Sequence, residues 1–131
     1  MALPNGAGGY QIGDGNLNEI NLSVQPTPNT YTTAVTLTVT DLENGLVICN
    51  SGTARNLTLP TAALTDAEIS SAKVGSCFDL SLLSTGAAAG TFVVGTGWTL
   101  VGSGAGVIGL AVLFRAVKTG DAAWSLYRIA G

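Results

Sequence analysis

The chain has 131 residues, which fits one domain, because compact domains commonly hold about 100–150 residues. Hydrophobic residues make up 47% and charged residues only 10%, against a usual charged share of about 25%, so we expect other subunits to cover part of the surface. The net charge is −3 and the five basic residues are scattered singly, which disfavours direct binding to nucleic acid.

Residues 1–30 predict an extended N-terminal arm, separate from a domain formed by residues 31–131. The arm is rich in glycine and asparagine and has no helical period, while Ile20, Leu22 and Val24 alternate with polar residues as in a short strand. Alone in water, such a segment buries too little apolar surface to offset its ordering entropy. We therefore expect its sparse apolar side chains to bind a partner: Tyr10, Ile12, Leu17, Ile20 and Leu22.

Residues 31–131 predict an all-β domain, either a compact antiparallel β-sandwich or a barrel, with a jelly-roll-like arrangement. Val35, Leu37 and Val39 alternate with threonines, which predicts a strand, and a turn is expected over residues 41–45. Further short strands, separated by glycine-rich turns, are expected at 46–50, 55–59, 76–84, 91–94, 98–101, 110–118 and 123–129.

One short helix is predicted within this domain. Residues 62–69 contain good helix formers and follow a proline, and Thr61, Thr65 or Asp66 can cap the first turn. We expect the helix to end before Gly75.

The sequence predicts a protein that is not an enzyme and that has no metal or cofactor site. It contains no histidine, which removes the commonest general base and the commonest metal ligand. Gly104, Gly106 and Gly109 match the pattern G-x-G-x-x-G, but the next segment is strand-like, so we interpret them as a strand connection and not as a phosphate-binding loop. A small carbohydrate-active enzyme is the weakest alternative, with Asp79 and Asp121 as its candidate carboxylates.

The large aromatic residues and the two cysteines are expected in the interior. Cys49 and Cys77 should be buried free thiols, because residues 1–5 have neither the basic start nor the apolar core of a secretory signal. No association with a membrane is expected, since the most apolar stretch, residues 107–117, is shorter than the roughly 20 residues that cross a bilayer. The rings expected in the core, or alternatively in a platform that stacks on sugars or bases, are Phe78, Phe92, Trp98, Phe114, Trp124 and Tyr127.

Several segments resemble the small capsid decoration proteins, or cement proteins, of tailed bacteriophages. The opening NGAGGYQIGDGNLNE (5–19) is similar to the N-terminal arm of that family. The similarity continues at LTLPTAA (57–63), VGSCF (74–78), GTGWTLVG (95–102), FR (114–115), KTG (118–120) and WSLYR (124–128). A similar β module, from Leu57 onward, occurs in other phage virion proteins, including tail and fibre components, so it is the arm that favours the capsid.

The resemblance implies a homotrimer on the outer surface of the capsid, made in the host cytoplasm and seated at three-fold or quasi-three-fold positions. There it would bridge major capsid protein subunits, with no catalytic residue, no cofactor and no small-molecule substrate. The alternative is a receptor- or glycan-binding domain of a phage tail fibre or spike, which would use exposed aromatics and turn carboxylates. On composition alone a monomer also stays open, because alanine and glycine raise the hydrophobic count without forming sticky patches.

Overall fold

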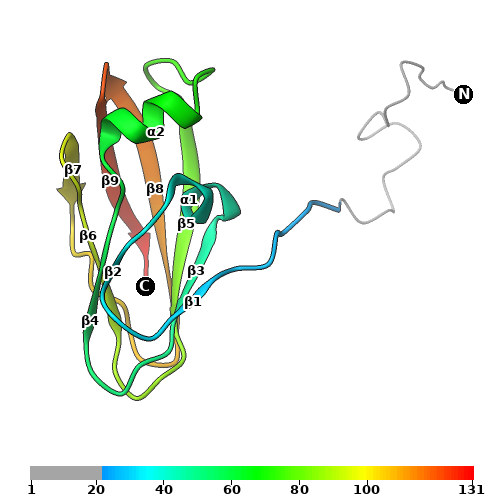
Figure 1. Ribbon diagram of the computed structural model, residues 1–131, viewed down its shortest axis with the longest axis vertical. Coiled ribbons are helices and arrows are strands. Elements are labelled where there is room, and N and C mark those ends of the chain that lie inside the picture. The colour runs from blue at the N-terminus through cyan, green and yellow to red at the C-terminus, as the bar shows by residue number, and fades with distance from the viewer. Residues whose placement is uncertain (1–21) are drawn as a thin grey trace, which may run out of the picture.

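Two β-sheets pack against each other in the computed structural model, which describes residues 22–131 (Figure 1). The predicted mostly-β character is confirmed, with two short helices, α1 (Val39–Asn44) and α2 (Ala62–Glu68). The smaller sheet has the strand order β2 (Val35–Thr36), β4 (Arg55–Thr58) and β6 (Gly90–Val93). The larger sheet has the order β1 (Thr30–Tyr31), β3 (Leu46–Cys49), β5 (Cys77–Ser84), β8 (Ala111–Gly120), β9 (Ala123–Ala130) and β7 (Trp98–Val101).

From β1 to β6 the chain winds back and forth between the two sheets. Odd-numbered strands enter the larger sheet and even-numbered strands the smaller one, and each strand from β3 to β6 lies parallel to the strand two places before it. Among the described strands, antiparallel pairing joins β5 to β8 and β8 to β9, while β7 lies parallel to β9. The predicted antiparallel, jelly-roll-like pairing is therefore wrong for most strands. Short strands divided by glycine-rich turns fit a crossing between sheets as well as a hairpin.

The strand and turn predicted over residues 35–45 are replaced by a two-residue strand and a helix. The Thr38 hydroxyl accepts the backbone N–H of Asp41 at 3.3 Å, and the Asp41 carboxylate accepts the backbone N–H of Thr38 at 3.0 Å. This reciprocal capping box fixes the first turn of α1. Gly45 ends the helix at φ 77°, a left-handed conformation that favours glycine. Helix capping thus outweighs the valine–threonine alternation, so the prediction of a strand followed by a turn is wrong here and α1 is a second helix.

The predicted short helix is confirmed as α2, which ends at Glu68, before Gly75 as expected. Thr61, one of the predicted caps, accepts a backbone N–H of the first turn through its hydroxyl. Asp66, another predicted cap, makes other contacts instead. Its carboxylate accepts the backbone N–H of Ala122 at 2.6 Å and the indole N–H of Trp124 at 2.8 Å. It also pairs with Lys118 at 3.1 Å. These contacts fix α2 on the turn that joins β8 to β9.

One apolar core lies between the sheets. Phe92 of β6 and Phe114 of β8 contact each other across it with ring centroids 5.0 Å apart, and Trp98 lies 5.7 Å from Trp124 on the neighbouring strand. Aromatic pairs of this kind add about 0.5–1.5 kcal/mol each beyond their area burial. The prediction of a buried ring is confirmed for these four; Phe78 is partly buried against the core, and the prediction is wrong for Tyr127, which alternation along β9 places on the opposite face. The other buried apolar residues are Leu37, Val39, Leu42, Val47, Cys49, Leu57, Leu59, Ala62, Leu80, Leu82, Val112, Ala116 and Leu126.

The glycine-rich segment between β7 and β8 packs edge to edge against β6. Gly104 accepts the backbone N–H of Phe92 at 2.9 Å, and Gly106 donates its N–H to the carbonyl oxygen of Gly90 at 2.8 Å. A Cβ atom on Gly104 would lie 2.2 Å from the carbonyl oxygen of Phe92, so glycine is needed for this approach. The interpretation of the G-x-G-x-x-G pattern as a strand connection is confirmed.

Replacing Gly104 by alanine should destabilise the fold by about 1–3 kcal/mol, because the added methyl group must push the segment away from β6. Gly52→Ala is the matched control, since a Cβ atom at Gly52 meets no atom within 4 Å. Urea unfolding of both variants gives the comparison. Equal stability of the two variants would contradict the close approach of the two backbones.

Candidate assembly surfaces

Residues 22–27 form an exposed segment that leads away from the body (Figure 1), with one contact back to it, in which the Gln25 side-chain amide donates to the carbonyl oxygen of Asn44 at 2.7 Å. Leu22 and Val24 are 89% and 90% exposed, so neither side chain packs on the described part of its own chain. Leu22 is thus placed where a partner can reach it. The other residues predicted to bind a partner lie outside the described residues: Tyr10, Ile12, Leu17 and Ile20.

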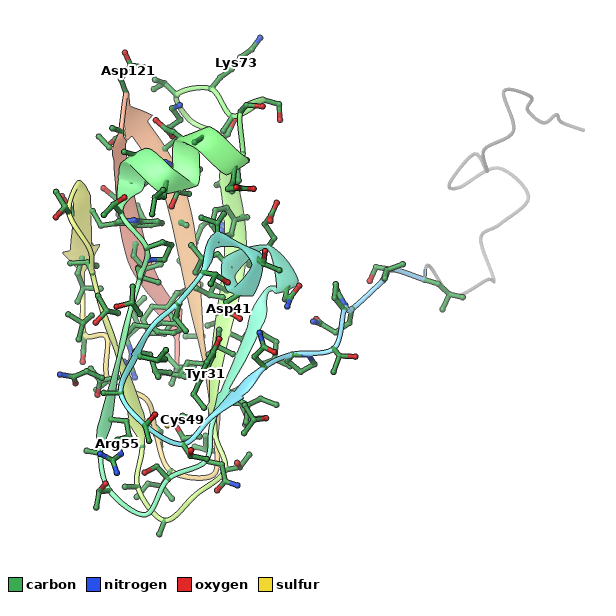
Figure 2. All side chains as sticks on the ribbon, in the orientation of Figure 1. Tyr31, Asp41, Cys49, Arg55, Lys73 and Asp121 are labelled. Atoms are coloured by element: carbon green, nitrogen blue, oxygen red, sulfur yellow. The ribbon has the colours of Figure 1, made fainter. Side chains whose placement is uncertain are left out.

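The arm joins the body at a buried carboxylate. The two oxygens of Asp41 accept hydrogen bonds from the Asn29 side-chain amide and the Tyr31 hydroxyl, each at 2.6 Å (Figure 2). β1 also pairs with β3, where Ile48 donates its N–H to the carbonyl oxygen of Asn29 at 3.2 Å. We call Asn29, Tyr31 and Asp41 the arm root, because they fix the point at which the arm leaves the body.

Asp41 stays charged although it is buried. Burial raises the pKa of Asp41, but hydrogen bonds from Tyr31, Asn29 and Thr38 outweigh burial and hold this pKa below its ordinary value of 3.8. For Tyr31, burial and the neighbouring carboxylate raise the pKa to about 12. At neutral pH the arm root therefore contains a charged acceptor and a neutral phenol donor, which is a strong type of hydrogen bond.

The larger sheet has a second face, formed by the residues that alternate with the core side chains. On this face, side chains of neighbouring strands form continuous rows, which we together call the outer face. The rows are Ile48, Leu83 and Ala111; Leu46, Ser81, Leu113 and Ala130; Asp79, Arg115, Tyr127 and Val101; and Cys77, Val117, Ser125 and Thr99.

Much of the outer face is apolar and open to solvent. Val101 is 45% exposed and Tyr127 36%, and Leu113 is only partly buried. Contiguous apolar surface of this kind is typical of a contact surface.

One ion pair lies near the middle of the outer face. The Arg115 guanidinium donates to the Asp79 carboxylate at 2.8 Å, between the two central strands β5 and β8. Both side chains point away from the core and are close to half exposed. The hydrogen bond from Arg115 lowers the pKa of Asp79, so both groups are charged at neutral pH. The rows of the outer face contain no other charged residue.

Of the two carboxylates considered for catalysis, one is held in an ion pair and the other lies exposed in a turn. Asp79 is paired with Arg115, and Asp121 is an exposed residue of the turn between β8 and β9, at one end of the molecule (Figure 2). A glycosidase acid needs a raised pKa, whereas the pKa of Asp79 is lowered.

The cysteines match the prediction in part. Both are free thiols, and Cys49 is buried as expected, but Cys77 is exposed on the outer face. Cys49 lies beside Ser84, so the length of β5, about 23 Å at about 3.3 Å per residue, separates it from Cys77. A disulfide within the chain is excluded at this distance. The prediction of a buried Cys77 is wrong because alternation along β5 places Phe78, and not Cys77, on the core side.

Neither α1 nor α2 could span a membrane, as both are too short, and residues 22–131 hold no cluster of ligating side chains suited to a metal ion. Comparisons with protein families, with curated proteins and with solved structures found no match. The arm root and the outer face are therefore interpreted from their own chemistry.

Asp41→Asn should destabilise the protein by about 1–3 kcal/mol at neutral pH, because an amide cannot accept every hydrogen bond made to the carboxylate. Since the folded pKa of Asp41 is lowered, its contribution is complete above the unfolded value of 3.8 and is lost as the pH falls through the folded value. Urea unfolding of wild type and variant from neutral to strongly acid pH measures this difference. The difference in the free energy of unfolding should shrink as the pH falls, and a constant difference would contradict the role of the charge. Asp121→Asn is the control and should leave the free energy of unfolding almost unchanged.

Proposed function

We propose that this chain is a capsid decoration protein of a tailed bacteriophage. As a homotrimer on the outer surface of the shell, it bridges major capsid protein subunits and holds them together. The sequence resemblance suggests the family, and the geometry of the arm root is the observation that carries the proposal.

The geometry of the arm root is consistent with an arm that binds another subunit. A buried carboxylate and two short hydrogen bonds fix the residues at which the arm begins, while Leu22 and Val24 project with almost no cover. A firmly held starting point lowers the entropy lost when the rest of a segment binds elsewhere. Apolar residues that alternate with polar ones suit binding by strand addition or in a groove of the partner.

The action of such a protein is mechanical. If the arm and the body together contact neighbouring capsid subunits only in the expanded lattice, binding favours that lattice by mass action. No bond is made or broken, so the function requires complementary surfaces and a stable body. The packed aromatic core and the fixed arm root supply that body.

The described surface is less suited to the alternative of glycan binding. A sugar site commonly presents flat aromatic rings to solvent, whereas Trp98 and Trp124 are buried and their indole N–H groups are bound to Pro60 and Asp66. Tyr127 is exposed, but its neighbours across the sheet are Arg115 and Val101.

The double variant Ile12→Asp/Leu17→Asp should lose binding to the shell, because each new carboxylate would have to be desolvated in an apolar contact. The assay is co-sedimentation of purified protein with expanded shells assembled from the major capsid protein of the same genome. We expect wild type in the pellet and the variant in the supernatant, with circular dichroism unchanged.

Two further proteins complete this test. A deletion of residues 1–24, which keeps the arm root, should behave like the double variant. Leu64→Asp/Val74→Asp introduces the same charge at two exposed apolar positions on the body and should bind as wild type does. If the arm variants pelleted with the shells as efficiently as wild type, the arm would not be the segment that binds.

A further inference from the structure

We propose that the outer face of the larger sheet is the surface through which copies of this chain bind one another. The existence of an assembly rests on the proposed function; what is added here is the surface that joins the copies.

The sequence of β8 indicates that both of its faces are covered in the working assembly. Strands with one solvent-exposed face alternate between apolar and polar residues, whereas strands buried on both faces carry near-continuous apolar runs. β8 begins AVLFRAV, in which Val112, Phe114 and Ala116 are buried in the core. Leu113 and Val117 point the other way and are only partly covered by their own chain.

The charges on the outer face favour a second copy as the occupant. Asp79 and Arg115 already neutralise each other, so the face leaves no free charge for an acidic or basic partner to pair with. A partner surface with unpaired charges would have to bury them at a cost of several kcal/mol per ion. The same face of another copy carries apolar side chains and one neutral pair, and therefore meets this requirement.

The position of the arm is compatible with this use of the face. β1 and β7 are the two opposite edges of the larger sheet, and the arm enters at β1. Val101 on β7 and Tyr127 on β9 lie at the other side of the sheet. Copies can therefore contact one another through the β7 and β9 side while their arms extend towards other subunits.

The test compares Val101→Asp/Leu113→Asp with Leu64→Asp/Val74→Asp, which carries the same charge change on exposed residues outside the outer face. Leu64 is 58% and Val74 is 70% exposed, so the control positions are at least as accessible as Val101. Mass is measured by light scattering after size-exclusion chromatography. We expect wild type and control at the same multiple of the chain mass, and the outer-face variant at the mass of one chain.

Thiol titration shows whether the outer-face variant is still folded. Cys49 is buried and Cys77 is exposed on the outer face, so a folded chain offers one reactive thiol and an unfolded chain two. The folded variant should expose one thiol, which reacts faster than Cys77 in the wild-type assembly. If the variant unfolds, the same comparison is made in wild type alone, where Cys77 should be less reactive in the assembly than after dilution to single chains.

The possible outcomes separate this inference from the proposed function. A monomeric wild type, an outer-face variant that stays assembled, or a Cys77 equally reactive in assembly and monomer would each overturn it. Loss of shell binding in the arm variants has no bearing on it. Conversely, an assembly that is disrupted by the outer-face variant supports it even if wild type fails to bind shells, in which case the proposed function alone is wrong.

Discussion

The rest of the structure depends on the packing of the two inner sheet faces around one aromatic core. Phe92 and Phe114 join the sheets, and Trp124 joins the larger sheet to α2 through Asp66. The six-stranded sheet packs one face on this core, and within residues 22–131 no further layer covers its other face. The same packing holds β1 and the arm root at a sheet edge, so the stable body also determines where the arm leaves.

The sequence predicted the elements at which only one local pattern, either apolar alternation or a helix cap, is present. β5, β8 and β9 follow from apolar alternation bounded by glycine-rich turns, and α2 follows from a threonine cap before a run of helix formers. α1 was missed because valine–threonine alternation and a capping box overlap at Thr38 to Asp41, and the cap prevailed. The parallel winding was not predictable, because strand spacing does not specify which strands become neighbours.

The candidate surfaces were predictable to different degrees. Composition and the character of the arm indicated contact with other subunits, and Leu22 is exposed as such a role needs. The outer face was missed, although the apolar run of β8 on both of its sides is a readable signal. The Asp79 and Arg115 pair and the Asp41 cluster depend on registers between distant segments, which the sequence alone does not give. The arm root is therefore visible only in the folded structure.

Taken together, we propose a body that contacts its own copies through one sheet face and reaches a further partner through its arm. The most direct measurement is electron cryo-microscopy of expanded shells, assembled from the major capsid protein of the same genome and incubated with this chain. We expect added density outside the shell at three-fold or quasi-three-fold positions, with the outer faces turned towards one another and the arms running to neighbouring subunits. Bare shells, or isolated single bodies whose outer faces are open to solvent, would contradict it.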